Sequence, residues 1–196
     1  MNASRFFLIR HGESTWNAAG RWQGHGDPPL SRNGREQARR MARELLDEGI
    51  EVVVASDLRR AVETAGILGE AIGVQPRVDA RLRELDVGDW TGLTREEIAA
   101  HAAAALAEFE SDDPEARAGT GECRREIAER VGIACADIAA AHAGRSVAVV
   151  AHLGVARALL PGCELANAEF RRVSAAELTG TATAIAAAGR ARPTAY

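Results

Sequence analysis

Three short apolar runs, each followed at once by polar residues, constrain this chain more than any other feature of its sequence. The runs cover residues 6–9, 52–55 and 147–151. Each has the length of a strand, far below the roughly 20 residues that cross a bilayer. Between the runs, apolar residues recur at the spacing of amphipathic helices. This alternation predicts a doubly wound α/β fold, with a mostly parallel sheet between two layers of helices.

The expected helices have recognisable first and last residues. Ser31 has the chemistry of an N-cap, and the apolar residues after it keep helical spacing until Gly49. Further helices are expected from 56–57 to 73, over 94–110, over 123–142 and in a short stretch before residue 161. Residues 77–90 predict extended or irregular structure, and 170–178 and 183–187 predict edge strands. We expect a single domain over residues 1–196.

Charge and composition exclude several classes of function. The chain has 24 basic and 28 acidic residues, a net charge of -4, and no lysine, so that every basic residue is an arginine. No basic surface is expected to bind nucleic acid or an anionic membrane. The chain has three cysteines, an odd number, and their spacing is not that of a metal site, so neither a disulfide framework nor a zinc site is expected. This cysteine content is compatible with a protein of the cytoplasm. The sequence is compatible with a homodimer.

Three groups of polar residues are expected to meet at one edge of the sheet. Arg10 and His11 follow the first apolar run, Arg60 follows the second, and His152 follows the third. The carboxyl ends of parallel strands lie at the same edge, where ligands bind in folds of this class. Forked guanidinium groups match phosphate oxygens, and a neutral imidazole is a nucleophile that also leaves readily. The pattern therefore indicates a phosphoryl pocket.

The motifs around these residues resemble a known family. Residues 10–17, R-H-G-E-S-T-W-N, are similar to the R-H-G-E-T-x-x-N signature of the histidine phosphatase superfamily, the phosphoglycerate mutase-like family. Four further motifs follow in the order of that family: residues 20–37, 56–65, 82–92 and 150–154. Residues 121–123, G-E-C, resemble its G-E-S. Together the motifs cover most of the chain.

The resemblance implies a role for each matching residue. His11 would attack phosphorus and become phosphohistidine, while Arg10, Arg60 and His152 hold the phosphate oxygens. Glu84 would protonate the leaving oxygen and later take a proton from water. The matching positions Asn17, Gln23 and Leu153 would also bind the substrate phosphate. No metal or other cofactor is implied.

The same residues are also compatible with other structures. Arg10 and His11 could form a strand-end ion pair, Arg60 could be a surface cation, and His11, His152 and Glu84 have the ligand types of a metal site, although neighbouring arginines repel cations. The chain also departs from the family pattern. Leu153 replaces a common glycine, Glu63 a glutamine and Cys123 a serine.

The implied function is hydrolysis of a small phosphorylated metabolite. Residues 94–121 would cover the pocket, and this segment is shorter than the insert of the cofactor-dependent phosphoglycerate mutases that the chain resembles. The sequence therefore favours a metal-independent phosphomonoesterase. A mutase is the alternative, and a non-catalytic binder of phosphorylated ligands is a third reading, which the intact His11 and Glu84 disfavour.

Overall fold

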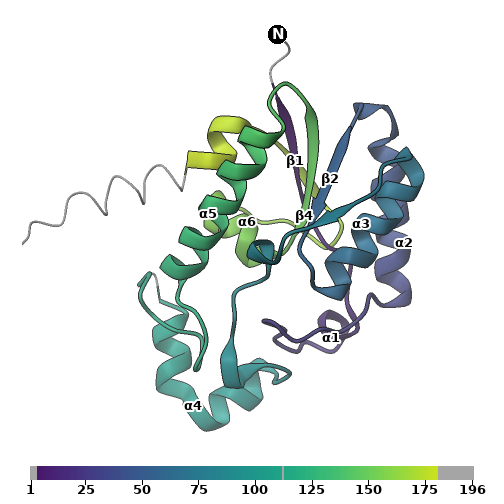
Figure 1. Cartoon of the computed structure of the whole chain (residues 1–196). Coiled ribbons are helices and arrows are strands. Elements are labelled where there is room, and N and C mark those ends of the chain that lie inside the picture. Colours follow the sequence, from purple (N-terminus) through teal and green to yellow (C-terminus); the bar gives the residue numbers. More distant parts are fainter. Residues whose placement is uncertain (1–3, 112, 181–196) are drawn as a thin grey trace, which may run out of the picture.

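The computed structural model of this chain, which describes residues 4–111 and 113–180, is built on one mixed sheet. Its strand order is β3-β2-β4-β1-β5. The strands are β1 (Arg5–Arg10), β2 (Val52–Ala55), β3 (Arg77–Val78), β4 (Ser146–Ala151) and β5 (Phe170–Ser174). The first four run parallel, and β5 pairs antiparallel with β1 at one edge. The predicted α/β class with a mostly parallel sheet is confirmed (Figure 1).

Helices cover both faces of the sheet. They are α1 (Thr15–Ala18), α2 (Arg32–Glu44), α3 (Arg59–Ile72), α4 (Arg95–Phe109), α5 (Arg124–Ala141) and α6 (Leu153–Leu159), with short 3-10 turns at Leu46–Glu48, Ala80–Leu82 and Gly88–Trp90. In Figure 1, α2 and α3 lie on one side of the strands and α5 and α6 on the other. The predicted layers are therefore present.

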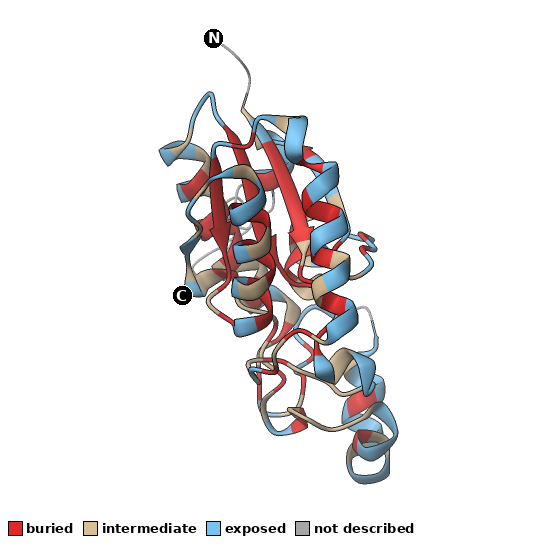
Figure 2. Ribbon diagram, turned by 90° about the vertical axis from the view of Figure 1, so that its right-hand side faces the viewer, coloured by how far each residue is buried: buried red, intermediate tan, exposed pale blue. Residues whose placement is uncertain are grey.

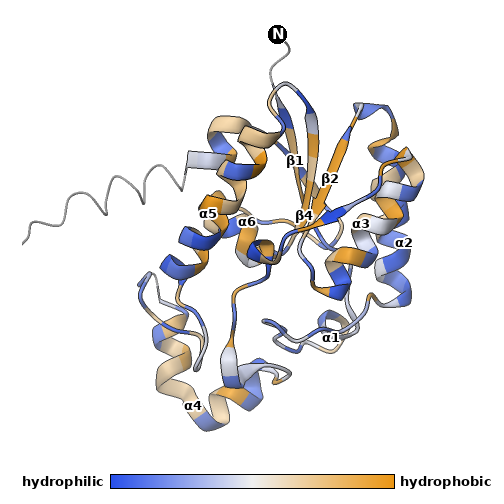
Figure 3. Ribbon diagram, in the orientation of Figure 1, coloured by the Kyte–Doolittle hydropathy of each residue, from blue (hydrophilic) through white to orange (hydrophobic). Residues whose placement is uncertain are grey.

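The sheet divides the core into two clusters because alternate residues of a strand point to opposite faces. Phe6 and Leu8 of β1 join the cluster that contains Ile127 of α5, whereas Phe7 and Ile9 join the cluster that contains Met41 of α2. Figure 2 shows the strands buried between helices whose outer faces are exposed, and Figure 3 shows the apolar colouring of β2. Burial on both faces explains why β1, β2 and β4 are continuous apolar runs.

The first residues of α2 and α3 show to what extent the local sequence determines where a helix begins. The Ser31 side chain accepts a hydrogen bond from the backbone N–H of Gly34, so the predicted N-cap of α2 is confirmed. Helix α3 begins later than expected, at Arg59. The Ser56 hydroxyl accepts from the N–H of Leu58 at 3.3 Å, and the carboxylate of Asp27 accepts from the N–H of Arg59 at 2.6 Å. The contact with Asp27 comes from a residue distant in the sequence, and no local pattern reveals it.

The strand predicted over Phe170–Leu178 is too long. Strand β5 ends at Ser174, and residues 175–180 are helical. The reason is a reciprocal cap: the Ser174 hydroxyl accepts from the N–H of Glu177 at 3.2 Å, and the Glu177 carboxylate accepts from the N–H of Ser174 at 2.8 Å. Such a capping box starts a helix. The strand predicted over 183–187 lies outside the described residues.

Helix α4 extends away from the sheet (Figure 1). It starts at the N-cap Thr94 and is interrupted at Ala102, whose φ of -143° and ψ of 42° are not helical. Its last residue, Phe109, packs edge to face with Trp22 and Trp90, with ring centroids 5.8 and 5.9 Å away. In the part of the chain that is described, no helix is long and apolar enough to span a bilayer.

Candidate active site

The register of the sheet brings the two predicted histidines together. Strand β1 pairs with β4 so that Arg10 lies opposite Ala151, and the next residues are His11 and His152. The backbone N–H of His11 continues the pairing by donating to the carbonyl of Ala151 at 3.0 Å. Both side chains are buried, and their ring centroids are 5.0 Å apart. Two residues that are 141 positions apart thus form one imidazole pair at the carboxyl edge.

Arg60 reaches the same site from the first turn of α3. Its guanidinium is fully buried, donates to the carbonyls of Gly24 and Gly26 at 3.0 and 2.7 Å, and leaves Nε without a partner among the described residues. Burial lowers the pKa of Arg60 to about 10, so the group is a cation at neutral pH. The alternative that Arg60 is a cation on the protein surface is wrong, because no part of its side chain is exposed to solvent.

Arg10 is fixed on the last position of β1. Its Nη1 donates to the carbonyl of Leu165 at 2.8 Å, while its buried Nε has no partner within the described chain. Both ring nitrogens of His152 are buried and equally unpartnered there. Buried polar groups are nearly always hydrogen-bonded in folded proteins. Unpartnered donors on Arg10, Arg60 and His152 around one histidine are therefore suited to receive the oxygens of a bound anion.

The electrostatics keep both imidazoles neutral. Burial lowers the pKa of His11 well below its usual range, and the charge of Arg60 lowers it further. Burial and Arg60 act on the pKa of His152 in the same direction. His11 Nδ1 lies 2.7 Å from the carbonyl of Gly12, which can only accept, so Nδ1 carries the proton. The lone pair is then on Nε2 of His11, as a nucleophile requires.

Glu84 is held by backbone donors on two segments. Its Oε1 accepts from the N–H of Leu85 at 2.8 Å, and its Oε2 accepts from the N–H of Gly154, on α6, at 3.3 Å. A Cβ at position 154 would lie 2.1 Å from Oε1 of Glu84, which is far inside van der Waals contact. Gly154 therefore permits this carboxyl to sit against α6.

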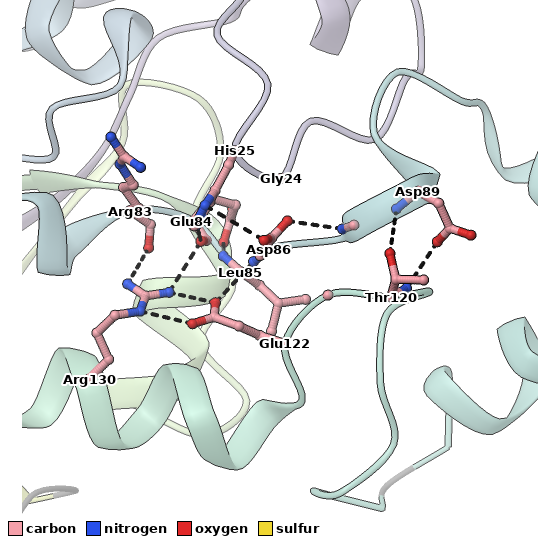
Figure 4. A network of polar contacts seen from close by, with 12 residues as sticks. Gly24, His25, Arg83, Glu84, Leu85, Asp86, Asp89, Thr120, Glu122 and Arg130 are labelled. Carbon is pink, nitrogen blue, oxygen red and sulfur yellow. Dashed lines mark hydrogen bonds and ion pairs between the residues drawn. The ribbon is translucent and has the colours of Figure 1, made fainter.

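A second layer of contacts fixes the Glu84 segment (Figure 4). Arg130, on α5, donates to the carbonyls of Arg83 and Glu84 at 3.0 and 3.3 Å and pairs with the carboxylate of Glu122 at 2.6 Å. Glu122 in turn accepts from the N–H of Asp86 at 3.0 Å. The segment is thus held by α5 through Arg130 on one side of Glu84 and by Glu122, which precedes α5, on the other side, and both contacts limit the movement of the segment.

The three remaining predicted residues also lie at the site. Asn17 and Gln23 line its pocket, and both are engaged by Ser14: the Asn17 Oδ1 accepts from the Ser14 N–H at 3.0 Å, and the Gln23 Oε1 accepts from the Ser14 hydroxyl at 2.7 Å. Because Ser14 binds the oxygen of each amide, the NH₂ group of each amide is not used in these two bonds. Leu153, the first residue of α6, contributes an apolar side chain to the wall.

The pocket has a volume of about 370 Å³, large enough for more than a phosphate group. Arg10, His11 and Glu84 line it, whereas Arg60 and His152 are buried and contribute no lining surface. Sequence reasoning missed several wall residues, which come from separate segments: Arg21, Trp22, Phe109, Arg124, Ile127 and Arg157. No motif or spacing singles these residues out, and the wall arginines belong to a chain in which every basic residue is an arginine.

This arrangement is suited to phosphoryl chemistry. Arg10, the neutral nucleophile His11 and the Glu84 carboxyl group line one pocket, and the buried guanidinium of Arg60 lies behind its wall. The Nε atoms of Arg10 and Arg60 have no partner among the described residues. Within residues 4–111 and 113–180, no group of three or more His, Cys, Asp or Glu side chains is placed to hold a metal ion. Phosphoryl transfer depends mainly on positioning and on neutralising the charge of the transferred group.

Comparison with known proteins identifies the family. The sequence model of the histidine phosphatase superfamily (branch 1) matches residues 6–192. The chain belongs to the histidine phosphatase superfamily. Among curated relatives, glucosyl-3-phosphoglycerate phosphatase of Mycobacterium tuberculosis is 40% identical over 167 residues, which are 81% of this chain and 74% of the relative.

Two further relatives of this histidine phosphatase show its range. The probable phosphoglycerate mutase GpmB of Klebsiella pneumoniae is 35% identical over 146 residues, 74% of this chain and 68% of the relative. The solved structure of Bacillus stearothermophilus YhfR superposes with a TM-score of 0.82 at 29% identity, covering 88% of this chain and 91% of that one. The fold is therefore shared well beyond the pocket motifs.

Proposed function

We propose that this histidine phosphatase is a metal-independent phosphomonoesterase that works through phosphohistidine. The observation that carries the proposal is the buried pair of neutral imidazoles beside two guanidinium groups whose buried Nε atoms have no partner among the described residues. The phosphatase relatives support hydrolysis as the reaction. The mutase alternative rests on more remote relatives and on no feature of the pocket.

In the first step, Nε2 of His11 attacks phosphorus, the bond to the ester oxygen breaks, and Glu84 gives its proton to that oxygen. In the second step, water attacks the phosphohistidine, Glu84 takes the proton from the water, and the P–N bond breaks to release inorganic phosphate. The first step leaves Glu84 as the carboxylate that the second step needs, and the second step returns it to the acid that the first step needs. The two proton transfers therefore need no further acid, base or metal.

Arg10, Arg60 and His152 act through the three non-bridging oxygens. Their donors are fixed before the substrate arrives, because Arg60 is anchored on carbonyls of the 24–26 loop and Arg10 on the carbonyl of Leu165. Preorganised donors in a site shielded from water are worth more than the same donors in solution. We assign Asn17 and Gln23, through their amide NH₂ groups, to the same oxygens, and Leu153 to the apolar wall.

The pocket also favours a small substrate. Residues 94–121 supply Phe109 to the wall, and we propose that this segment covers the bound ester. The described cysteines, Cys123, Cys135 and Cys163, are buried free thiols, which agrees with a cytoplasmic enzyme acting on a phosphorylated metabolite. The substrates named for the relatives are the substrates of those proteins.

Phosphate release from p-nitrophenyl phosphate, with and without EDTA, tests the proposal. We expect turnover that EDTA leaves unchanged and that added Mg²⁺ or Zn²⁺ does not raise. Loss of activity in EDTA, restored by a divalent ion, would contradict the metal-independent mechanism. Formation of a bisphosphate when excess monophosphate meets the phosphorylated enzyme would instead identify a mutase.

A further inference from the structure

Two parts of the site must keep a fixed separation for the proposed mechanism to work. Arg60 holds oxygens of the phosphate, and Glu84 protonates the ester oxygen that is bonded to the same phosphorus atom. The distance between the acid and that oxygen therefore depends on where the segments that carry Arg60 and Glu84 lie relative to each other. A misplacement of about 1 Å in a reacting group costs roughly 100-fold in rate. A contact that joins the two segments therefore affects the rate even where it touches no substrate.

His25 provides such a contact. The carbonyls of its neighbours, Gly24 and Gly26, accept hydrogen bonds from the guanidinium of Arg60 at 3.0 and 2.7 Å. The imidazole reaches the other segment, where its Nε2 lies 2.9 Å from the backbone carbonyl of Glu84 (Figure 4). Because a carbonyl oxygen can only accept, Nε2 carries the proton and donates it to this bond. His25 thus connects the loop that holds Arg60 to the main chain of Glu84.

The bond from His25 fixes how its loop lies against the Glu84 segment, residues 84–87. Gly24 brings the two into contact, since its φ is +46° and a Cβ there would lie 2.8 Å from the backbone nitrogen of Val87. In the part of the chain that is described, the His25 bond is the one hydrogen bond between the loop and this segment. The other ring nitrogen, Nδ1, lies 3.8 Å from the carboxylate of Asp86, beyond hydrogen-bond distance. The donor on Nε2 is therefore the atom of His25 that joins the two parts.

The place of His25 leaves it no direct part in the chemistry. Its ring is half-buried, and His25 does not line the pocket, whereas Gly24 and Glu84 do. Arg130 donates to the same carbonyl of Glu84 at 3.3 Å, but from α5. Arg130 therefore holds Glu84 to a helix, while His25 holds it to the loop on which the phosphate-binding Arg60 is anchored.

We propose that His25 is a positioning residue, whose Nε2–H bond to the Glu84 carbonyl sets the distance between the proton-donating carboxyl group and the phosphate held by Arg60. This inference rests on the proposed function and adds a residue to it. While the bond is present, the acid stays within reach of the ester oxygen. Without it, Arg60 keeps its two carbonyl partners and the phosphate still binds, whereas protonation of the leaving oxygen becomes slower.

Two substitutions separate the hydrogen bond from the bulk of the ring. The amide nitrogen of glutamine reaches about as far as Nε2 and that of asparagine only about as far as Nδ1, so His25→Gln keeps a donor for the carbonyl and His25→Asn does not. Single-turnover phosphorylation of the full chain is measured with glycerol 3-phosphate and with p-nitrophenyl phosphate. We expect His25→Asn to slow the first about 10- to 100-fold and the second less than about threefold, since p-nitrophenolate departs with little help from an acid. In His25→Gln both rates, and in both variants the calorimetric affinity for inorganic phosphate, should stay within about threefold of the unsubstituted chain.

His142 provides the control. It lies between the end of α5 and the start of β4, at the edge of the sheet opposite the site, so His142→Asn should change neither rate. Equal slowing of both substrates in His25→Asn, or the same losses in His25→Gln, would show that the ring only fills space and would overturn the proposal, as would unchanged rates in His25→Asn. Glu84→Gln is measured alongside. If it shows the leaving-group dependence and His25→Asn does not, the positioning role alone is wrong; if neither variant shows it, the proposed acid is wrong as well.

Discussion

Replacement of Gly154 by alanine tests whether the position of Glu84 controls its function as an acid. The added Cβ would lie 2.1 Å from Oε1 of Glu84, whereas C···O contacts begin near about 3.3 Å. The carboxyl must therefore retreat by roughly 1.2 Å and give up its bond to the residue 154 N–H. A displacement of about 1 Å in a reacting group costs roughly 100-fold in rate. We expect that loss in the phosphorylation step for an alkyl phosphate.

Leaving-group dependence separates this effect from general damage. p-Nitrophenolate departs with little help from an acid, so its phosphorylation step should slow far less than that of an alkyl phosphate. Single-turnover rates are compared for the two substrates, because Glu84 also acts in dephosphorylation. Glu84→Gln should show the same dependence. The atom that must move is the end of a flexible side chain, so the free energy of unfolding should change by less than about 1 kcal/mol.

The matched control is Gly66→Ala, in α3, where a Cβ would meet nothing within 4 Å. That variant should keep full activity and gain up to about 1 kcal/mol of stability from helix propensity. If Gly154→Ala slowed both substrates equally, or neither, the proposed contact between Glu84 and α6 would not be what positions the acid.

Two further predictions concern stability. The pKa values of His11 and His152 are lower in the folded state than in the unfolded chain. The free energy of unfolding should therefore be highest above the unfolded pKa, near 6.5, and should fall as the pH falls below that value. Each histidine should contribute a slope of about 1.4 kcal/mol per pH unit there, measured by urea unfolding, and a flat profile between pH 6.5 and 5.5 would contradict the buried neutral pair. Arg130→Ala removes the hydrogen bonds to the carbonyls and the ion pair with Glu122 that Figure 4 shows. We expect the free energy of unfolding to fall by about 3 kcal/mol. A loss below about 1 kcal/mol would show that this network does not stabilise the fold.

The sequence predicted the sheet because its strands are buried on both faces. Such strands appear as continuous apolar runs, and each run was located within one or two residues of β1, β2 and β4. The C-terminal region was harder. The apolar content of residues 170–178 suggested a strand throughout, although the capping box of Ser174 and Glu177 was legible in the sequence and marks a helix start.

The residues that meet at the site were predictable because each follows a strand end or lies in a family motif. His11 and His152 meet through the β1–β4 register, which parallel strands enforce. Their catalytic roles stay predictions. The wall residue Arg124 could not be singled out in a chain in which every basic residue is arginine. Its place in the wall depends on how α4 and α5 fold against the pocket.

Covalent phosphorylation of His11 is the claim on which the proposed mechanism depends. Rapid acid and alkaline quenching of the enzyme with ³²P-labelled substrate, followed by peptide mapping, tests it most directly. We predict a phosphoenzyme that is stable in alkali, labile in acid and confined to the peptide containing His11, with His11→Ala losing about 10³-fold or more in turnover. Fast turnover without any trapped phosphoenzyme, or label on another residue, would contradict the mechanism.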